Sequence, residues 1–459
     1  MKPQDLHSYI QLFKEYTELR AQENRQARIT MVNGDVMANL KTTTSGISAR
    51  VYKQGMWGFA SHPEISDDTI RQVVTSATEN ACFLDSRSSQ KAEPLPYAAT
   101  TEHHDFATQH PRAPQQDLIE FVNIVDSYLV KYYEKLHSRT IVLHLLDMEK
   151  SLITADGSST YSMTPRAIMY VILTVEKDGE PFELMDAYGG FGQFEDVFTQ
   201  PDKIFEQIDR QYEHLLRKAN GVYPKAGMAD CILDADLAGI LAHEAIGHTA
   251  EADGVMGGSV AGDYVNEQVA SPLVSLVDFA HTASGTLCPV PVFTDDEGTK
   301  AQDVTLIEDG VLKGFLHNKE SARHFHTTPT GNARAFQFSD EPIIRMRNTA
   351  ILPGKQTLSE MIASIDDGYY LMQAGDGQAD STSEFMFGIT MGYEIKHGKL
   401  GKAIKDTTIS GVAFDMLKTV SMVSNDMIWK CSGMCGKKQW IPVGMGGPAI
   451  KCQLNLGGK

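Results

Sequence analysis

The sequence predicts an α+β fold, in which N-terminal and middle α/β units with antiparallel strands precede a large β-rich C-terminal domain. Three observations predict this fold. Helical and strand-like hydrophobic patterns alternate over the first half of the chain, turn signals connect successive strands, and Gly-rich strand-like segments dominate the last part. The 459 residues suggest about three folding units, at roughly 150 residues per domain.

Four segments are expected along the chain. Residues 1–84 form an N-terminal α+β domain, and residues 116–222 form a middle α+β domain. The stretch 85–115 between them is rich in Ser, Pro, Gln and Thr with little periodicity, which is typical of a linker. Residues 225–459 form the C-terminal β-rich domain.

Local patterns place the elements of the first two domains. A helix is expected over residues 6–19, where apolar residues recur at helical spacing, and Asn33-Gly34 predicts a hairpin turn. Ser66 is expected to cap a helix whose apolar face is Ile70, Val73, Val74, Ala77 and Ala81. Further strands are expected over residues 27–32, 46–52, 56–60, 141–146 and 167–175. Further helices are expected over residues 118–129 and 203–218, with a flexible break at residues 189–192.

The C-terminal domain is expected to begin with a strand over residues 231–233 and a helix over residues 237–248. Gly310 and Gly398 each lie between two strand-like runs and predict hairpin tips. One amphipathic helix is expected over residues 358–365.

Composition excludes several classes of function. The net charge of −18 disfavours nucleic-acid binding, which requires Lys and Arg to neutralise phosphates. No secretory signal follows Met1, and no apolar run reaches the roughly 18–20 residues needed to span a membrane. Six cysteines in so long a chain predict reduced thiols and a cytoplasmic protein.

The run from Leu241 to Glu251 contains the pattern His-Glu-x-x-x-His, formed by His243, Glu244 and His248. Two histidines five residues apart diverge by about 140° on a regular helix and could not share one metal ion. They can do so if the helix widens into a π turn or ends near Gly247. Gly247 permits either, because glycine accepts backbone angles that other residues avoid.

With that geometry His243 and His248 can act as neutral imidazole ligands of Zn²⁺. Zinc lowers the pKa of a bound water to roughly 7, and Glu244 can then accept its proton as general base during attack on a peptide carbonyl. A catalytic zinc needs a third protein ligand. The spacing leaves four candidates open: Glu251, Asp253, Cys431 and Cys435. The C-terminal domain is therefore predicted to bind a metal.

Two charged clusters carry weaker signals. Asp295-Asp296-Glu297-Gly298 is expected to be an exposed turn rather than a metal site. Arg345-Met346-Arg347-Asn348 is expected to be a solvated strand end rather than a clamp for a substrate carboxylate.

Several motifs together resemble the TldD/PmbA family of metalloproteases, and specifically its TldD branch. The His-Glu-x-x-x-His run assigns the branch, since the PmbA branch lacks it. The other matching pieces are residues 55–60, 295–298, 345–349, 422–426, 435–437 and 442–444. The older label of this family is modulator of DNA gyrase, which implies a genetic link and not DNA binding.

The resemblance implies that His243, His248 and Cys435 hold zinc and that Glu244 is catalytic, with Glu251 and Asp253 in supporting roles. It also implies a cytoplasmic peptidase that hydrolyses unfolded or extended peptides, in peptide maturation or degradation. TldD-type chains pair with PmbA-type chains, so a homodimer or such a heterodimer is expected. The alternative is a non-catalytic assembly or regulatory subunit, whose structural zinc would take Cys431 and Cys435 together with both histidines.

Overall fold

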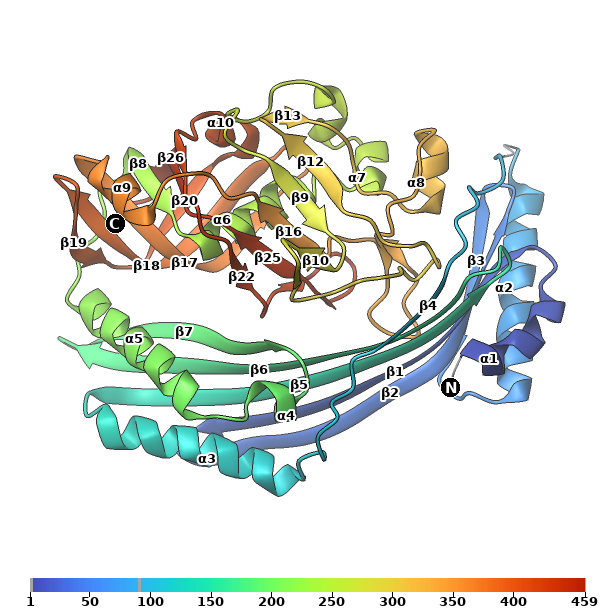
Figure 1. The fold of residues 1–459 in the computed structure, drawn as a ribbon, viewed down its shortest axis with the longest axis horizontal. Helices are drawn as coiled ribbons and strands as arrows, with labels where there is room; N and C mark the ends of the chain where they lie inside the picture. Colours follow the sequence, from blue (N-terminus) through green and yellow to red (C-terminus); the bar gives the residue numbers. More distant parts are fainter. Residues whose placement is uncertain (1–2, 90–91, 459) are drawn as a thin grey trace.

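The computed structural model describes residues 3–89 and 92–458, and a long twisted sheet runs along one side of the molecule (Figure 1). The strand order is β3-β2-β1-β5-β6-β4, and β7 also pairs with β6. This single sheet joins strands from the first segment and from the middle segment. The strands are β1 (Tyr16–Val32), β2 (Asp35–Lys53), β3 (Met56–His62), β4 (Thr101–Asp105), β5 (Leu136–Thr154), β6 (Ser159–Lys177) and β7 (Glu180–Phe191).

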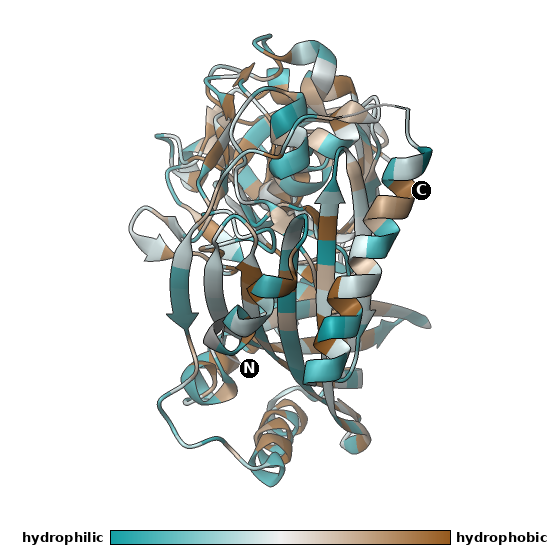
Figure 2. Ribbon diagram, turned by 90° about the vertical axis from the view of Figure 1, so that its right-hand side faces the viewer, coloured by the Kyte–Doolittle hydropathy of each residue, from teal (hydrophilic) through white to brown (hydrophobic). Residues whose placement is uncertain are grey.

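Helices cover one face and one end of this sheet. They are α1 (Pro3–Leu6) with a 3-10 turn (His7–Leu12), α2 (Asp67–Arg87), α3 (Gln115–Tyr132), α4 (Phe194–Val197) and α5 (Asp202–Ala219). The apolar sides of α3 and α5 share one buried cluster with β5 and β6. The apolar side of α2 packs in a second cluster with β1 and β2. Figure 2 views the α2 end of the molecule and shows hydrophilic and hydrophobic residues alternating along the helix.

The predicted hairpin at Asn33-Gly34 and the predicted helix after Ser66 are confirmed. Asn33 and Gly34 have φ angles of 51° and 93°, and the turn joins Val32 to its partner Asp35. The Ser66 side chain accepts a hydrogen bond from Thr69 N at 3.3 Å, so the predicted cap is present. All five residues of the predicted α2 face are buried.

Three local expectations are wrong. The helix expected over residues 6–19 ends at Leu12, and Tyr16 already begins β1, because pairing with β2 and β5 on both sides overrides the local period. Residues 189–192 are not a flexible break, since β7 continues to Phe191 beside β6. Within the stretch expected as a linker, Thr101–Asp105 forms β4, which pairs in parallel with β6.

The C-terminal part contains two larger sheets. One has the order β17-β8-β26-β20-β18-β19, with β21 on β26, and the other has the order β13-β12-β9-β16-β25-β22. Helix α6 (Ala235–Leu241) packs between them, against β17 of the first sheet and β25 and β22 of the second. The predicted hairpin tips at Gly310 and Gly398 are confirmed.

The strands of these sheets are β8 (Gly227–Leu233), β9 (Leu276–Phe279), β12 (Val304–Glu308), β13 (Val311–Leu312), β16 (Asn348–Ile351), β17 (Asp367–Ala379), β18 (Glu384–Lys396), β19 (Lys399–Ile404), β20 (Thr407–Val412), β21 (Met422–Val423), β22 (Ile428–Lys430), β25 (Gly444–Gly447) and β26 (Ile450–Leu456). Short two-stranded pairs are β10 (Thr282–Ala283) with β11 (Thr286–Leu287), β14 (Ala333–Arg334) with β15 (Ile343–Ile344), and β23 (Met434–Cys435) with β24 (Ile441–Pro442). The helices are α7 (Ala252–Met256), α8 (Lys319–His324), α9 (Leu358–Ala363) and α10 (Ala413–Lys418), with a 3-10 turn at Val260–Tyr264.

Buried ion pairs join the long sheet to the C-terminal part. Asp296 lies 2.7 Å from Lys150 Nζ and 3.6 Å from Arg20 Nη1, and Glu297 lies 2.8 Å from Arg50 Nη1. The expectation of an exposed turn at these acidic residues is therefore wrong, because cations of β1, β2 and β5 compensate their burial. Within the described residues, no helix is long and apolar enough to cross a bilayer.

Candidate metal centre

The helix that carries the two histidines changes its winding where they occur. After α6, residues Ala242–Gly247 form a π-helical turn, in which His248 N donates to His243 O at 3.2 Å. This wider turn, one of the two distortions considered from the five-residue spacing, brings both imidazoles to one side. Their ring centroids lie 5.3 Å apart, with the planes at 80°.

Gly247 is required by packing. A β-carbon at this position would overlap the sulfur of Met346, which is fully buried. Met346 thus fills the space beside the π turn, and any larger residue at position 247 would displace one or the other.

Cys435 reaches the same place from the far end of the chain. Its Sγ lies 3.1 Å from His248 Nε2, and the ligand atoms of His243, His248 and Cys435 all lie within 4.8 Å of one another. Among the described residues this is the one group of three or more His, Cys, Asp or Glu side chains close enough to hold an ion. Cys435 lies on the short strand β23, which pairs with β24, and its cross-strand partner is Ile441.

The other three candidates for the third ligand lie elsewhere or have other partners. The Cys431 thiol donates to the carbonyl of Gly189 at 2.9 Å, so the four-ligand set of a structural zinc is not assembled. Glu251 accepts from His248 Nδ1 at 2.9 Å, and Asp253 pairs with Lys437 Nζ at 2.7 Å.

Glu251 links His248 to a cation. Its buried carboxylate lies 3.1 Å from Lys437 Nζ as well as against His248 Nδ1. A carboxylate on one ring nitrogen fixes the tautomer and orientation of a histidine, so that the other nitrogen faces the centre. Glu251 therefore aims His248 Nε2 at Cys435.

Glu244 lies beside the centre and outside the donor group. Its Oε2 is 3.7 Å from His248 Nε2, and 29% of its side chain is exposed. His243 is fully buried and Cys435 nearly so. The carboxylate thus lies on the side where water can reach the donors, next to the partly exposed His248.

The chemistry of the three donors fits zinc. Burial raises the pKa of the Cys435 thiol, but the adjacent His243 and His248 outweigh burial and lower it to about 3. A thiolate is the form that binds zinc. Both ring nitrogens of the buried His243 lack a hydrogen-bond partner among the described residues, which is costly unless something else completes the site. Imidazole nitrogen and thiolate sulfur are both ordinary zinc ligands, and three protein ligands is the number found at catalytic zinc sites.

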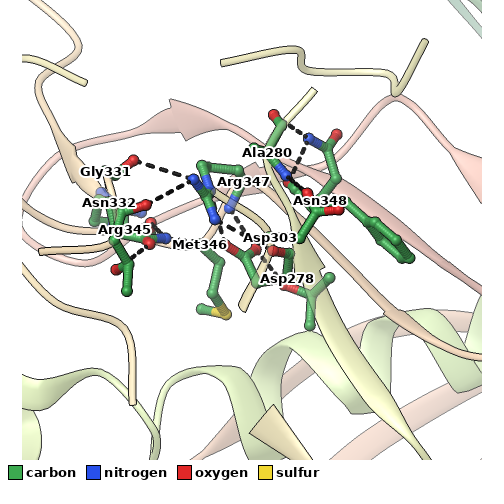
Figure 3. A network of polar contacts seen from close by, with 12 residues as sticks. Asp278, Ala280, Asp303, Gly331, Asn332, Arg345, Met346, Arg347 and Asn348 are labelled. Atoms are coloured by element: carbon green, nitrogen blue, oxygen red, sulfur yellow. Dashed lines mark hydrogen bonds and ion pairs between the residues drawn. The ribbon is translucent and has the colours of Figure 1, made fainter. Parts of the chain in front are cut away.

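Arg345 was missed as a site residue and is buried rather than solvated. Its guanidinium donates to the main-chain carbonyls of Cys435 (2.7 Å), Lys437 (3.1 Å) and Gln439 (2.8 Å). Arg347 is also fully buried and pairs with Asp278 at 2.9 Å (Figure 3). The apolar residues on both sides of these arginines, from Ile343 to Ile351, were the signal of a buried segment.

Comparison with known proteins identifies the family. A family model described as the PmbA/TldA metallopeptidase C-terminal domain matches residues 226–458, more than half of the chain. The chain belongs to the TldD/PmbA family. A second model of that family, for domain 1, matches residues 17–81. The resemblance of the motifs is thereby confirmed, and the protein is a member of a metallopeptidase family.

Relatives in the TldD/PmbA family align along almost the whole chain. A zinc metalloprotease TldD homologue of Saccharolobus solfataricus is 30% identical, with 90% of each chain covered. A metalloprotease of Methanocaldococcus jannaschii is 29% identical, with 95% of this chain and 96% of the relative covered.

Solved structures share the fold at low identity. TldE of Thermococcus kodakarensis superposes with a TM-score of 0.77 at 17% identity, over 99% of both chains. A protein of Thermotoga maritima described as a putative modulator of a DNA gyrase gives 0.78 at 19% identity, over 99% of this chain and 98% of the other. These likenesses confirm the α+β architecture.

Proposed function

We propose that this protein is a zinc-dependent metallopeptidase that hydrolyses peptide bonds in unfolded or extended peptides. The observation that carries the proposal is the group formed by His243, His248 and Cys435, with ligand atoms within 4.8 Å of one another and Glu244 beside it. The zinc metalloprotease name of the Saccharolobus relative supports the choice of metal.

The residues of the chain divide the chemistry among them. Zinc held by the two imidazoles and the thiolate would supply a Lewis acid for the attack of water on a peptide carbonyl. Glu244 accepts the proton of the attacking water at its carboxylate and delivers it to the leaving amine. Glu251 keeps His248 in the orientation that leaves Nε2 free.

Burial of the donors favours an extended substrate. His243 and Cys435 are almost inaccessible, and the π turn that carries His243 contacts β16 and β17, one strand of each C-terminal sheet. A folded protein surface could not bring a peptide carbonyl into this space, whereas a single extended strand could enter it. Extended peptides also offer main-chain groups for strand-like pairing.

The exchange Glu244→Gln tests the proposal. It keeps the shape of the side chain and removes the base, so peptide hydrolysis should fall by about 10²–10⁴-fold while the zinc content stays at one ion per chain. Glu79→Gln, at an exposed position of α2, is the matched control and should keep full activity. Full activity in Glu244→Gln would contradict the role of this residue as general base.

We also propose that the chain works as a cytoplasmic dimer, either with a second copy or with a PmbA-type partner. The support is the exposure of large apolar side chains on the long sheet, where Met37, Leu40 and Met185 are each more than half exposed. Leu40 and Met185 line one groove of about 400 Å³ with His144 and Tyr170. Sedimentation of the purified chain, alone and mixed with a PmbA-type protein, measures which pairing occurs.

A further inference from the structure

A second cavity lies between the long sheet and the C-terminal part, apart from the residues of the metal centre. Its volume is about 80 Å³. Alternate residues of β5 and β6, among them Met148 and Thr164, form one wall, and residues 289–296 form the opposite wall. About half of the side chains around it are apolar, including Leu146, Val292 and Ile441.

Two buried guanidinium groups, those of Arg166 and Arg334, line this cavity together with the carboxylates of Asp295 and Asp296. Arg166 donates to the carbonyl of Cys431 and lies 3.7 Å from Met434 Sδ, while Arg334 donates to the carbonyls of Met346 and Pro442. No described acidic side chain forms an ion pair with either arginine. The Nε of Arg166 is buried and has no partner among the described residues.

Lys150, the third cation that lines the cavity, has an ion-pair partner, unlike the two arginines. Lys150 pairs with Asp296 at 2.7 Å, as buried charges in proteins usually do. Burial lowers the pKa of both arginines, and burial together with Arg345 lowers that of Arg334 to about 9 against the opposite effect of Asp296 and Asp278. An anion between Arg166 and Arg334 would compensate this unpaired positive charge.

The cavity is connected to the metal centre through two of its lining residues. Ile441 is the cross-strand partner of Cys435, so this wall lies one strand spacing, about 5 Å, from the main chain of Cys435. Arg334 holds the carbonyl of Met346, whose side chain packs against Gly247 between the two histidines. A peptide whose end occupied the cavity would therefore lie within a few residues of the centre.

We propose that this cavity binds the C-terminal carboxylate of a substrate peptide together with a small apolar last side chain, with Arg166 and Arg334 as the anion-binding pair. The inference rests on the proposed peptidase function and adds a preference for a free peptide end. The volume fits a group of a few heavy atoms and is far below the roughly 300 Å³ or more of a pocket for a larger ligand.

Binding of paired peptides tests the inference separately from catalysis. The zinc-loaded Glu244→Gln protein is titrated with an N-terminally dye-labelled peptide ending in Ala, as the free acid and as the amide, and anisotropy is recorded. We expect the acid to bind about tenfold to a hundredfold more tightly, the range of hydrogen bonds to a charged group. Equal dissociation constants would overturn the inference while leaving the proposed function intact.

A second pair of peptides distinguishes the source of the carboxylate. Two C-terminally amidated peptides differ only in carrying Glu or Gln at the penultimate position. We expect equal binding of these two peptides. Tighter binding of the Glu peptide, with no difference between acid and amide ends, would overturn the assignment of the cavity to the main-chain terminus.

Substitutions then locate the binding site. Arg166→Gln should reduce the ratio between acid and amide to about one, and Arg166→Lys should retain part of it. Arg71→Gln is the matched control, because Arg71 is an exposed arginine of α2 that does not line the cavity. The ratio should be unchanged in this control. A loss of the ratio in Arg71→Gln equal to that in Arg166→Gln would overturn the placement.

Discussion

The guanidinium of Arg345 donates a 2.7 Å hydrogen bond to the main-chain carbonyl of Cys435. The same group holds the carbonyls of Lys437 and Gln439, so one buried side chain fixes both ends of the turn that follows the thiolate. Lys438 in this turn has a φ of 57°, which is unfavourable for a residue with a side chain. Arg345 is therefore a positioning residue for Cys435, the third member of the candidate metal centre.

Arg345→Lys should weaken zinc binding by about 10–100-fold, because lysine cannot reach three carbonyls at once. Competition with a chromogenic chelator measures the affinity. Arg347→Lys is the control, since Arg347 is equally buried but pairs with Asp278 and contacts none of the residues 435–439. It should lower the thermal stability without a comparable loss of zinc affinity in the folded protein. Equal losses of affinity in both variants would show that Arg345 acts only through stability.

Gly247→Ala should destabilise both the fold and the centre. The added methyl group overlaps Met346, and overpacking of this kind costs about 1–3 kcal/mol. Zinc affinity should fall as well, because Gly247 lies in the π turn that sets the relative position of His243 and His248. The double variant Gly247→Ala/Met346→Ala should recover part of the loss, and a double-mutant cycle on the unfolding free energy measures the coupling. Strictly additive effects would mean that the two residues do not interact.

The two cysteines near the centre should respond differently to the same change. Cys435→Ser should abolish stoichiometric zinc binding, because a hydroxyl is a much poorer zinc ligand than a thiolate. Cys431→Ser should retain zinc, since its sulfur contacts Gly189 and lies outside the donor group. Elemental analysis of the two purified variants measures their zinc content per chain. A loss of zinc in both variants would favour a structural site with two thiolates.

Stability should depend on pH through Glu18. Glu18 is buried beside Arg50, with Glu297, Lys319 and Tyr16 around it, and burial raises its pKa from 4.5 to about 8. The folded state therefore keeps a proton that the unfolded state releases, so this group's contribution to stability is lost as pH rises from about 5 to about 8.

Glu18→Gln should flatten the decline of unfolding free energy over this range, by about 1–3 kcal/mol in total. Urea unfolding at half-unit pH steps measures the slope, and Glu79→Gln, an exposed site, should keep that of the wild type. An unchanged slope in Glu18→Gln would assign the retained proton to another group.

Local signals predicted those parts of the fold that depend on neighbouring residues. The turn at Asn33-Gly34 and the cap at Ser66 need only a few adjacent residues, and both are present. Strand β4 could not be predicted, because its short polar sequence is a strand only through pairing with β6. The start of β1 at Tyr16 could not be predicted either, because it too depends on pairing with a neighbouring strand.

The same distinction applies to the candidate site. The spacing of His243 and His248 was enough to predict a distorted turn, because both lie on one segment. Spacing could not choose Cys435 over Cys431, since that choice depends on contacts with Arg345 and Gly189 from distant segments. Charged residues such as Arg345 and Asp296 were expected at the surface, as most charges are, and only their tertiary partners explain their burial.

The ion pairs of Asp296 and Glu297 make the two halves of the polypeptide mutually dependent. A fragment that began near residue 225 would leave these carboxylates without Arg20, Lys150 and Arg50, and the sheet would keep three cations facing water where its partner had been. Each half thus needs the other to compensate its buried charges. Recombination between family members would have to exchange the acidic residues and their cationic partners together.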